Sequence, residues 1–166
     1  FAVRKGEVFN LHTGISSVDE DGALKNLTKE TPKFDFVAYR TNANAIWNSQ
    51  MERIEVFGSN ENDKIKFYTA LYHCFIHPSV ANDVDKRYRG RDNKIHDNGK
   101  NGEYYTVFSL WDTYRSLHPL FNIIQPQFNL DFLETFATQF RQGGRLPVWE
   151  LSGYETNCMI GYHAVS

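Results

Sequence analysis

The chain has 166 residues, with 18 basic and 20 acidic side chains and a formal net charge of −2. This length is enough for one domain with a sizeable core, and the balanced charge excludes a broad basic surface for nucleic acid or an anionic membrane. Because the sequence has no run of about 18 apolar residues, we expect no segment that spans a membrane.

Aromatic residues make up 15% of the chain, with 13 Phe, 9 Tyr and 3 Trp. Aromatic rings bury large apolar areas in cores, and they also form the walls of sugar sites, where a ring face meets the C–H face of a pyranose. The two cysteines, Cys74 and Cys158, show no CxxC or other zinc spacing, and the sequence leaves a single disulfide between them as an open alternative. The chain opens on Phe1 without an initiator methionine, so we expect a piece of a longer polypeptide.

A small β part is expected before the first helix. Apolar residues alternate weakly with Thr and Ser over residues 2–18, which favours one or two strands. Asp19 or Asp21 is suited to cap a helix through residues 21–30, and Pro32 ends that helix.

Two longer helices are predicted next. Apolar residues recur at spacings of three and four from Phe36 to Ile54, which predicts an amphipathic helix that stops before Gly58. Another helix begins at an Asn or Asp cap near residue 60 and runs toward Pro78. Its apolar residues lie on nearly every face, which indicates a buried helix.

The second half of the chain predicts a long loop, a short strand and three helices. Residues 79–103 are polar and glycine-rich without a period, and long ordered loops in compact domains are often functional. A strand is expected at residues 103–108. Helices are expected at 111–124, at 126–142 up to a glycine pair, and from 153 to the end of the chain.

Two groups of residues have the types that bind metals. His73 and His77 stand four residues apart on the predicted helix, but no HExxH motif accompanies them, so a structural pair fits the pattern better than zinc. Asp83, Asp85 and Asp92 lie near turn residues and would suit calcium, but the EF-hand order is absent. The alternative is a solvated loop whose charged side chains pair with each other.

The stretch "SLWDTYR" places Trp111, Asp112 and Arg115 at the start of a predicted helix. Asp112 and Arg115 are three residues apart and share a helix face. A carboxylate and a guanidinium there would offer acceptors and donors to adjacent hydroxyls, and the neighbouring indole would supply a stacking wall. The alternative is a helix N-terminus with Asp112 near the positive dipole end and Arg115 as its salt-bridge partner.

A second stretch with candidate site residues, "GGRLPVWELSGYET", has Trp149, Glu150 and Glu155 on a predicted connection between helices. Two carboxylates could be the acid and base of a glycosidase, whose catalytic groups lie roughly 5–9.5 Å apart. The alternative is that Glu155 caps the next helix and Glu150 is solvated. Spacing alone does not choose between these interpretations.

These motifs together resemble glycoside hydrolase family 92, the calcium-dependent exo-acting α-mannosidases. The resemblance rests on "FYTALYH", "DVDKRYRG", "YYTVFSLWDTYRSLHPL", "QGGRLPVWELSGYET" and "CMIGYH", in the family's order and spacing. It implies an N-terminal β-sandwich followed by an (α/α)6 barrel. The expected fold is therefore mainly α with a small N-terminal β part. Residues 1–20 would end the sandwich, 21–78 would form connecting helices, and 79–166 would begin the barrel.

The resemblance also implies a reaction: hydrolysis of terminal α-linked mannose from mannose-rich glycans, with α-1,2 as the expected linkage, and with inversion. The implied partners are a mannose-containing oligosaccharide and the remainder of the polypeptide, and the implied cofactor is calcium. The family's general acid, base and calcium ligands are expected outside these 166 residues. Location outside the cell, in the periplasm or at the cell surface follows from the substrate class, although no signal peptide is visible.

Site residues are assigned by matching the family's motifs. Asp112 would contact hydroxyls of the terminal mannose, with Trp111 and Arg115 supporting that contact, while Trp149 and Glu155 would line the same pocket. Two alternatives stay open. The chain could be a non-catalytic helical module that binds carbohydrate or protein, or part of an (α/α)6 enzyme that acts on another sugar.

Overall fold

The computed structural model describes residues 3–99 and 102–165. Its helices are α1 (Glu20–Glu30), α2 (Phe36–Met51), α3 (Glu61–Cys74), α4 (Leu110–Thr113), α5 (Leu117–Ile124) and α6 (Pro126–Gly143). Its strands are β1 (Ser79–Val80), β2 (Arg87–Arg89), β3 (Ile95–Asp97), β4 (Tyr105–Thr106), β5 (Phe108–Ser109), β6 (Trp149–Leu151) and β7 (Tyr154–Glu155). Helices are the main regular structure, as predicted, but the short strands lie between residues 79 and 155 and not at the N-terminus. Within the described ranges, no helix is long and apolar enough to cross a membrane.

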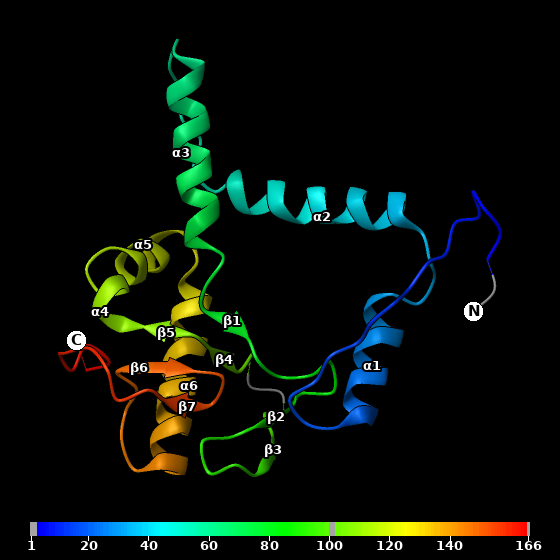
Figure 1. Ribbon diagram of the computed structural model, residues 1–166. Coiled ribbons are helices and arrows are strands. Elements are labelled where there is room, and N and C mark those ends of the chain that lie inside the picture. The colour runs from blue at the N-terminus through cyan, green and yellow to red at the C-terminus, as the bar shows by residue number, and fades with distance from the viewer. Residues whose placement is uncertain (1–2, 100–101, 166) are drawn as a thin grey trace.

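The core lies where α5 and α6 pack against β4 and β5 (Figure 1). The rings of Phe108 and Phe136 meet edge to face, with centroids 4.7 Å apart, and those of Tyr105 and Phe132 meet at 4.8 Å. Burial of each such ring contributes about 1.5–3 kcal/mol. The buried members of this cluster are Tyr105, Phe108, Leu110, Phe121, Phe132 and Phe136. They anchor the segment that leads into α4.

The strands form three small antiparallel sheets within the part of the chain that the structure describes. β1 pairs with β4, β2 pairs with β3, and β5, β6 and β7 lie in that order in the third sheet. In the third sheet, Phe108 faces Glu150 and Ser109 faces Trp149. The stretches "SLWDTYR" and "PVWELSGYET" are therefore neighbours in space.

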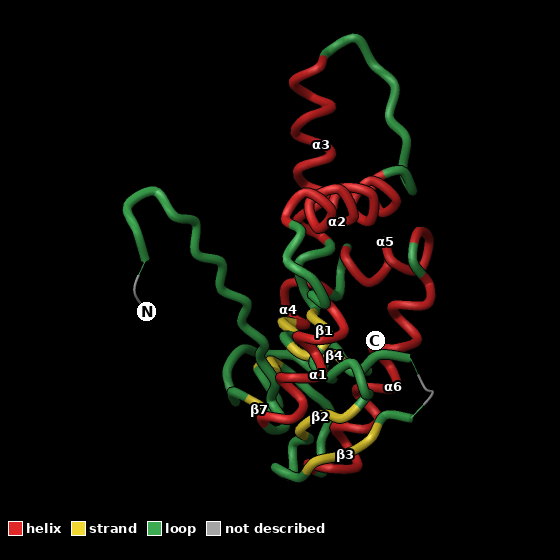
Figure 2. The backbone as a smooth tube through the Cα atoms, turned by 90° about the vertical axis from the view of Figure 1, so that its right-hand side faces the viewer, coloured by secondary structure: helices red, strands yellow, loops and turns green. Residues whose placement is uncertain are grey.

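α2 and α3 project away from this body (Figures 1 and 2). Both begin at side-chain caps, because Asp35 accepts from the Ala38 N–H at 2.9 Å and Asn60 accepts from the Asn62 N–H at 3.1 Å. The cap of α3 was predicted, and that of α2 was not. α2 has no buried residue, and Leu71 is the single buried residue of α3 among the residues described. The prediction that α3 is buried is therefore wrong, because no layer of the described chain covers this helix.

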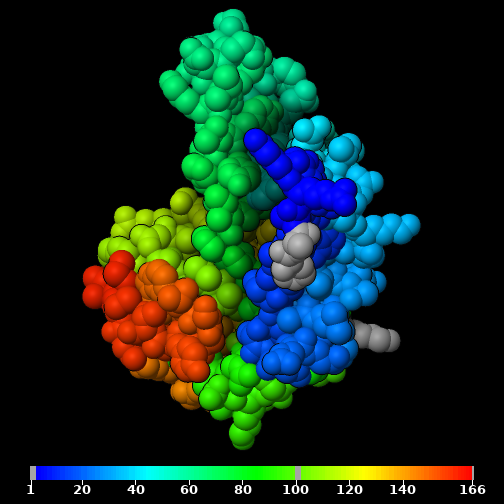
Figure 3. Space-filling model, turned by 45° about the vertical axis from the view of Figure 1, so that its right-hand side comes forward, coloured from blue at the N-terminus to red at the C-terminus, as the bar shows by residue number. Residues whose placement is uncertain are grey.

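The predicted N-terminal strands are also absent from the described residues before α1. Residues 3–18 form a turn at 5–6 and otherwise lack helix or strand, and their last part is fixed by one side chain from the loop before β2 and one from β2 itself, without strand pairing. The Ser16 hydroxyl donates to Asp83 at 2.6 Å, and the Arg89 guanidinium donates to the Ser17 carbonyl at 2.8 Å. Figure 3 shows the N-terminal segment and α1 against the chain around residue 90.

The segment 79–103 is more ordered than predicted, because it contains β1 and the β2–β3 hairpin. The predicted helix over 111–124 is divided into α4 and α5. Pro119 has no N–H, and its ring would clash with the carbonyl of residue 115 in one continuous helix. α6 has the predicted ends, with Pro126 in its first turn and Gly144 at φ 76° after its last residue.

The helix predicted after Gly153 is wrong. Ser152 and Gly153 have φ values of 52° and 87°, and this left-handed turn returns the chain as β7. After Glu155 the described chain continues without a helix. Cys74 and Cys158 are both free thiols, so the possible bridge is not formed.

Candidate functional site

Strand β5 runs directly into α4, which carries Asp112. Leu110 is buried in the core and fixes the first turn of this helix. Ser109 precedes it, and the Ser109 hydroxyl donates a hydrogen bond to the Asp112 carboxylate. The Thr113 hydroxyl donates to the Ser109 carbonyl at 3.1 Å. The Asp112 side chain is exposed to solvent, and the hydrogen bond from Ser109 fixes its carboxylate.

The alternative interpretation, in which Arg115 forms a salt bridge with Asp112, is wrong. The Nε of Arg115 donates to the Tyr114 hydroxyl at 2.6 Å. Its guanidinium carbon lies 5.3 Å from the centre of the Tyr114 ring and 5.9 Å from that of Trp111. These distances are in the range of cation–π contacts. Trp111, Asp112 and Arg115 therefore form one surface group, with a carboxylate and a guanidinium both exposed beside an indole.

Two aromatic residues that were not predicted as site residues, Tyr114 and His163, lie beside this group. The His163 ring stacks on Tyr114 with centroids 3.8 Å apart and an interplanar angle of 12°, and it lies 5.6 Å from Trp111. A cavity of about 240 Å³ borders both Tyr114 and His163. The one signal in the sequence was that "CMIGYH" and "WDTYR" belong to the same set of motifs.

Trp149 lies next to this group, since it is the ladder partner of Ser109. Its indole is half-buried. The Glu155 carboxylate accepts from the backbone N–H groups of Val148 at 2.8 Å and Trp149 at 3.1 Å. Glu155 therefore fixes the start of β6 and does not cap a helix, which corrects that alternative.

Glu150 is 0% exposed, so the interpretation of a solvated carboxylate is wrong. The carboxylate accepts from the Thr106 hydroxyl at 2.8 Å, the Val107 N–H at 3.0 Å and the Gly153 N–H at 2.6 Å. Burial raises the pKa of Glu150, and the hydrogen bonds from Gly153, Thr106 and Val107 oppose that rise. These contacts favour a structural use of this carboxylate over contact with a substrate.

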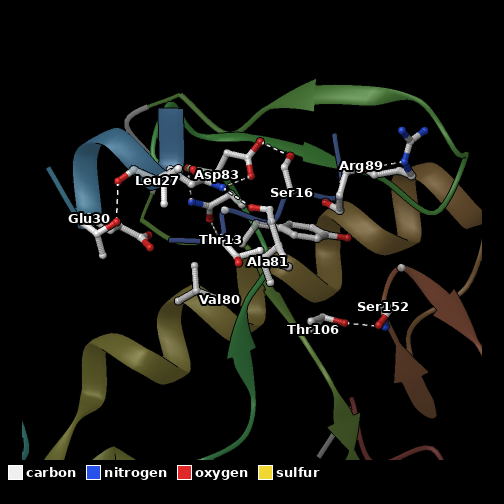
Figure 4. Close-up of a pocket in the computed structure, with 18 residues that line it drawn as sticks. Thr13, Ser16, Leu27, Glu30, Val80, Ala81, Asp83, Arg89, Thr106 and Ser152 are labelled. Atoms are coloured by element: carbon white, nitrogen blue, oxygen red, sulfur yellow. Dashed lines mark hydrogen bonds between the residues drawn. The ribbon is translucent and has the colours of Figure 1, made fainter. Parts of the chain in front are cut away.

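A larger cavity of about 590 Å³ lies between the N-terminal segment, α1, β1 and the β6–β7 turn (Figure 4). Two pairs of its polar residues bond to each other, since the Ser16 hydroxyl donates to Asp83 and the Ser152 N–H donates to the Thr106 hydroxyl (Figure 4). Trp111, Asp112 and Trp149 line neither this cavity nor the smaller one.

The described residues do not fit a calcium site. No group of three or more His, Cys, Asp or Glu side chains in residues 3–99 and 102–165 is placed to hold a metal ion. Asp83 accepts from Ser16 and Asn26, Asp85 pairs with Arg87 at 2.9 Å, and Asp92 bonds to His96 at 2.9 Å.

The two histidines predicted to share a helix face do not do so. α3 ends at Cys74, so that His73 lies in its last turn and His77 lies beyond it. The Nδ1 atom of His77 is 2.9 Å from the Ser79 hydroxyl, with which it shares a hydrogen bond.

Comparison with known proteins shows which family has this sequence and this fold. The profile of the glycosyl hydrolase family 92 catalytic domain matches residues 22–166. A family GH92 α-mannosidase from Bacteroides thetaiotaomicron is 39% identical, with a TM-score of 0.85 over 90% of this chain and 20% of that one. Its complex with mannoimidazole has the same values. A GH92 inverting mannosidase from B. thetaiotaomicron VPI-5482 is 27% identical, with a TM-score of 0.83 over 90% of this chain and 20% of that one.

No curated protein matched the chain. The chain spans 20% of the length of the three solved structures above. Because the family profile covers most of the chain and the structural likeness covers nearly all of it, the chain belongs to glycosyl hydrolase family 92.

Proposed function

We propose that this chain is part of an exo-acting α-mannosidase that hydrolyses terminal α-linked mannose, with α-1,2 as the expected linkage. The observation that carries the proposal is the family match together with the 39% identity to an α-mannosidase. Mannoimidazole bound to that mannosidase supports a mannose-containing oligosaccharide as the substrate.

The group around α4 supplies the contacts that such a sugar needs. Trp111 offers an apolar ring face to the C–H face of a pyranose. The exposed Asp112 carboxylate accepts hydrogen bonds from adjacent hydroxyls, and charge makes these bonds about twice as strong as neutral ones. Arg115 donates to a neighbouring oxygen. Trp149 and Glu155 extend the same wall along β6 and β7.

Inversion is the stereochemistry that we propose, and the printed description of one similar mannosidase supports it. An inverting glycosidase uses a general acid and a general base whose carboxyl groups lie roughly 6.5–9.5 Å apart. We place both outside this chain. The burial of Glu150 and the backbone bonds of Glu155 argue against the alternative that these two are the catalytic pair.

Calcium belongs to the proposal as a cofactor held by ligands outside the described residues. A bound calcium ion would supply a hard cation for sugar hydroxyls. The residues of this chain contribute hydrogen bonds and ring faces instead, and they hold the sugar in position.

The domain organisation that we propose places residues 1–20 at the end of a β-sandwich, 21–78 in connecting helices and 79–166 at the start of an (α/α)6 barrel. Leu130, Leu133 and Phe140 of α6 are each more than half exposed. This apolar side supports the proposal that further helices of the barrel pack against α6. The remainder of the polypeptide is therefore a proposed partner. Location outside the cell, in the periplasm or at the cell surface follows from a glycan substrate.

A non-catalytic helical binding module is the second candidate function. The exposed apolar side chains of α2 and α6 also suit a partner protein, and Asp112 lines neither cavity. The two candidates differ in one measurable property, because only the enzyme releases free sugar.

The test uses the complete protein with α-1,2-, α-1,3- and α-1,6-linked mannobiose, in calcium and after treatment with a chelator. We expect release of mannose that requires calcium, and NMR should show the β-anomer first. α-Glucosides and β-mannosides serve as controls. Absence of sugar release from all α-mannosides, with retained binding of mannose or of a protein, would favour the second candidate.

A further inference from the structure

Glu150 occupies the junction of three backbone segments. Its carboxylate accepts hydrogen bonds from Thr106 at the end of β4, from the Val107 N–H between β4 and β5, and from the Gly153 N–H in the β6–β7 turn. The Thr106 hydroxyl in turn accepts from the Ser152 N–H at 2.8 Å (Figure 4). A single buried side chain thus ties a kink in one strand to a turn in the facing hairpin.

Both tied segments have strained backbone. Val107 has φ 68° and Ser152 has φ 52°, so both lie in the left-handed region that non-glycine residues rarely adopt. For a β-branched residue such as Val107 this conformation is an outlier. Residues in such conformations persist only where surrounding contacts fix them, and the Glu150 carboxylate makes the contact at the Val107 N–H.

The Val107 kink sets the direction of the segment that ends at Asp112. It separates β4 from β5, and β5 continues into α4 without an intervening loop. Ser109, the last residue of β5, donates to the Asp112 carboxylate. The same Ser109 pairs with Trp149, which is the residue next to Glu150. Only a few covalent and hydrogen-bonded links therefore separate Glu150 from the proposed sugar contact.

We propose that Glu150 is a positioning residue for substrate binding, which acts by fixing the Val107 kink and thereby the place of the Asp112 carboxylate. This inference rests on the proposed function, because it assumes that Asp112 contacts the sugar. Glu150 itself contacts neither the substrate nor the reacting atoms, since its carboxylate is buried and accepts from groups of the protein.

Replacement of this carboxylate by an amide makes a specific prediction. In Glu150→Gln, the NH₂ group would face the Val107 N–H if it replaced Oε2 and the Gly153 N–H if it replaced Oε1, so the junction would lose one of these two bonds that tie the kink to the turn. Displacement of a binding group by about 1 Å can lower activity by on the order of 100-fold. We expect a loss of this order in kcat/KM of the complete enzyme. Glu134→Gln is the matched control, because Glu134 is exposed on α6 and pairs with Arg141.

A double-mutant cycle with Asp112→Asn tests whether Glu150 acts through Asp112. If it does, Glu150→Gln should lower kcat/KM strongly in the wild-type background and little further in the Asp112→Asn background. The pH profile of the remaining activity should keep both limbs. Additive losses, or the disappearance of one limb in Glu150→Gln, would overturn the inference in favour of an independent or catalytic role.

Two further variants keep the test decisive if Glu150→Gln folds poorly. Val107→Gly removes the strain of the left-handed conformation, so Val107→Gly combined with Glu150→Gln should recover part of the lost kcat/KM. Thr106→Val removes one hydroxyl donor and should show a weaker form of the same coupling to Asp112. If neither variant shows recovery or coupling, Glu150 serves the fold alone and the inference is wrong.

The two single variants separate this inference from the proposed function. If the wild-type protein releases no mannose, or if Asp112→Asn retains full activity, the proposed function or its sugar contact fails. If Asp112→Asn loses activity while the effects of the two substitutions remain additive, only the positioning role of Glu150 fails.

Discussion

Replacement of Asp112 by alanine separates recognition of the sugar from stability of the fold. Asp112 is exposed, and within the described residues its carboxylate accepts a hydrogen bond from the Ser109 hydroxyl. Surface substitutions of this kind usually change the free energy of unfolding by within about 0.5 kcal/mol. We therefore expect Asp112→Ala to melt near the wild-type temperature.

The effect on catalysis should be much larger. A hydrogen bond to a charged group contributes about 1.5–3 kcal/mol. If Asp112 makes one such bond to a mannose hydroxyl in the transition state, its loss lowers kcat/KM by roughly 10- to 150-fold, since about 1.4 kcal/mol corresponds to tenfold. Two bonds to adjacent hydroxyls would square this factor.

The assay is kcat/KM of the complete enzyme on an aryl α-mannoside, measured beside thermal unfolding by circular dichroism. Asp112→Asn is the matched variant, because it keeps the size of the side chain and removes its charge. A kcat/KM of Asp112→Ala within twofold of wild type would refute the assignment of the sugar contact. An unfolding temperature far below wild type would refute the claim that Asp112 is dispensable for the fold.

Three more predictions concern stability. Phe132→Ala should lower the free energy of unfolding by about 3–5 kcal/mol in chemical denaturation, because this ring is 2% exposed in the core. A smaller loss than that of the exposed-site control Leu133→Ala would contradict the core assignment. Burial lowers the pKa of His118, so its neutral form stabilises the fold above the unfolded pKa near 6.5, and this contribution is lost as pH falls through the lowered folded value. Unfolding temperatures from pH 8 to 5 should therefore fall less in His118→Gln than in wild type, and parallel curves would argue against this. The Arg87 guanidinium lowers the pKa of Asp19 to about 2, so this pair stabilises the fold above pH about 4 and is lost as pH falls toward 2. NMR titration of Asp19 should show that Arg87→Ala returns the pKa toward 3.8, and an unchanged value would contradict the pairing.

The elements that were predicted correctly are those with local signals. Asp19 caps α1 by accepting from the Gly22 N–H, and Pro126 and Gly144 mark the two ends of α6. Capping side chains, proline and glycine act within a few residues of the helix end, so their effect can be read from the sequence.

The elements that were predicted wrongly depend on contacts between distant residues. The segment 3–18 reads as strand, but Asp83 and Arg89 fix its end through side chains more than 65 positions away. The chain after Gly153 has a helical pattern, yet a strand pair forms there, because the Thr106 hydroxyl donates to Glu150 and accepts from the Ser152 N–H. Weak local preference yields to tertiary contacts in such cases.

In the candidate site, too, the features with local signals were predictable and those that depend on distant residues were not. Trp111, Asp112 and Arg115 are neighbours in sequence, so their grouping was predictable from "SLWDTYR". The stack of His163 on Tyr114 and the burial of Glu150 were not, because both arise from pairing of segments about 40–50 residues apart. No spacing rule in one sequence reports such pairs.

We propose that this chain supplies the wall that recognises the terminal mannose, and the most direct test is a crystal structure of the complete protein with mannoimidazole. We expect an Asp112 carboxylate oxygen within about 2.5–3.2 Å of a ring hydroxyl, and the face of Trp111 or Trp149 against the sugar's C–H groups. A well-ordered sugar bound elsewhere, with Asp112 and both indoles in contact only with solvent or protein, would contradict the claim.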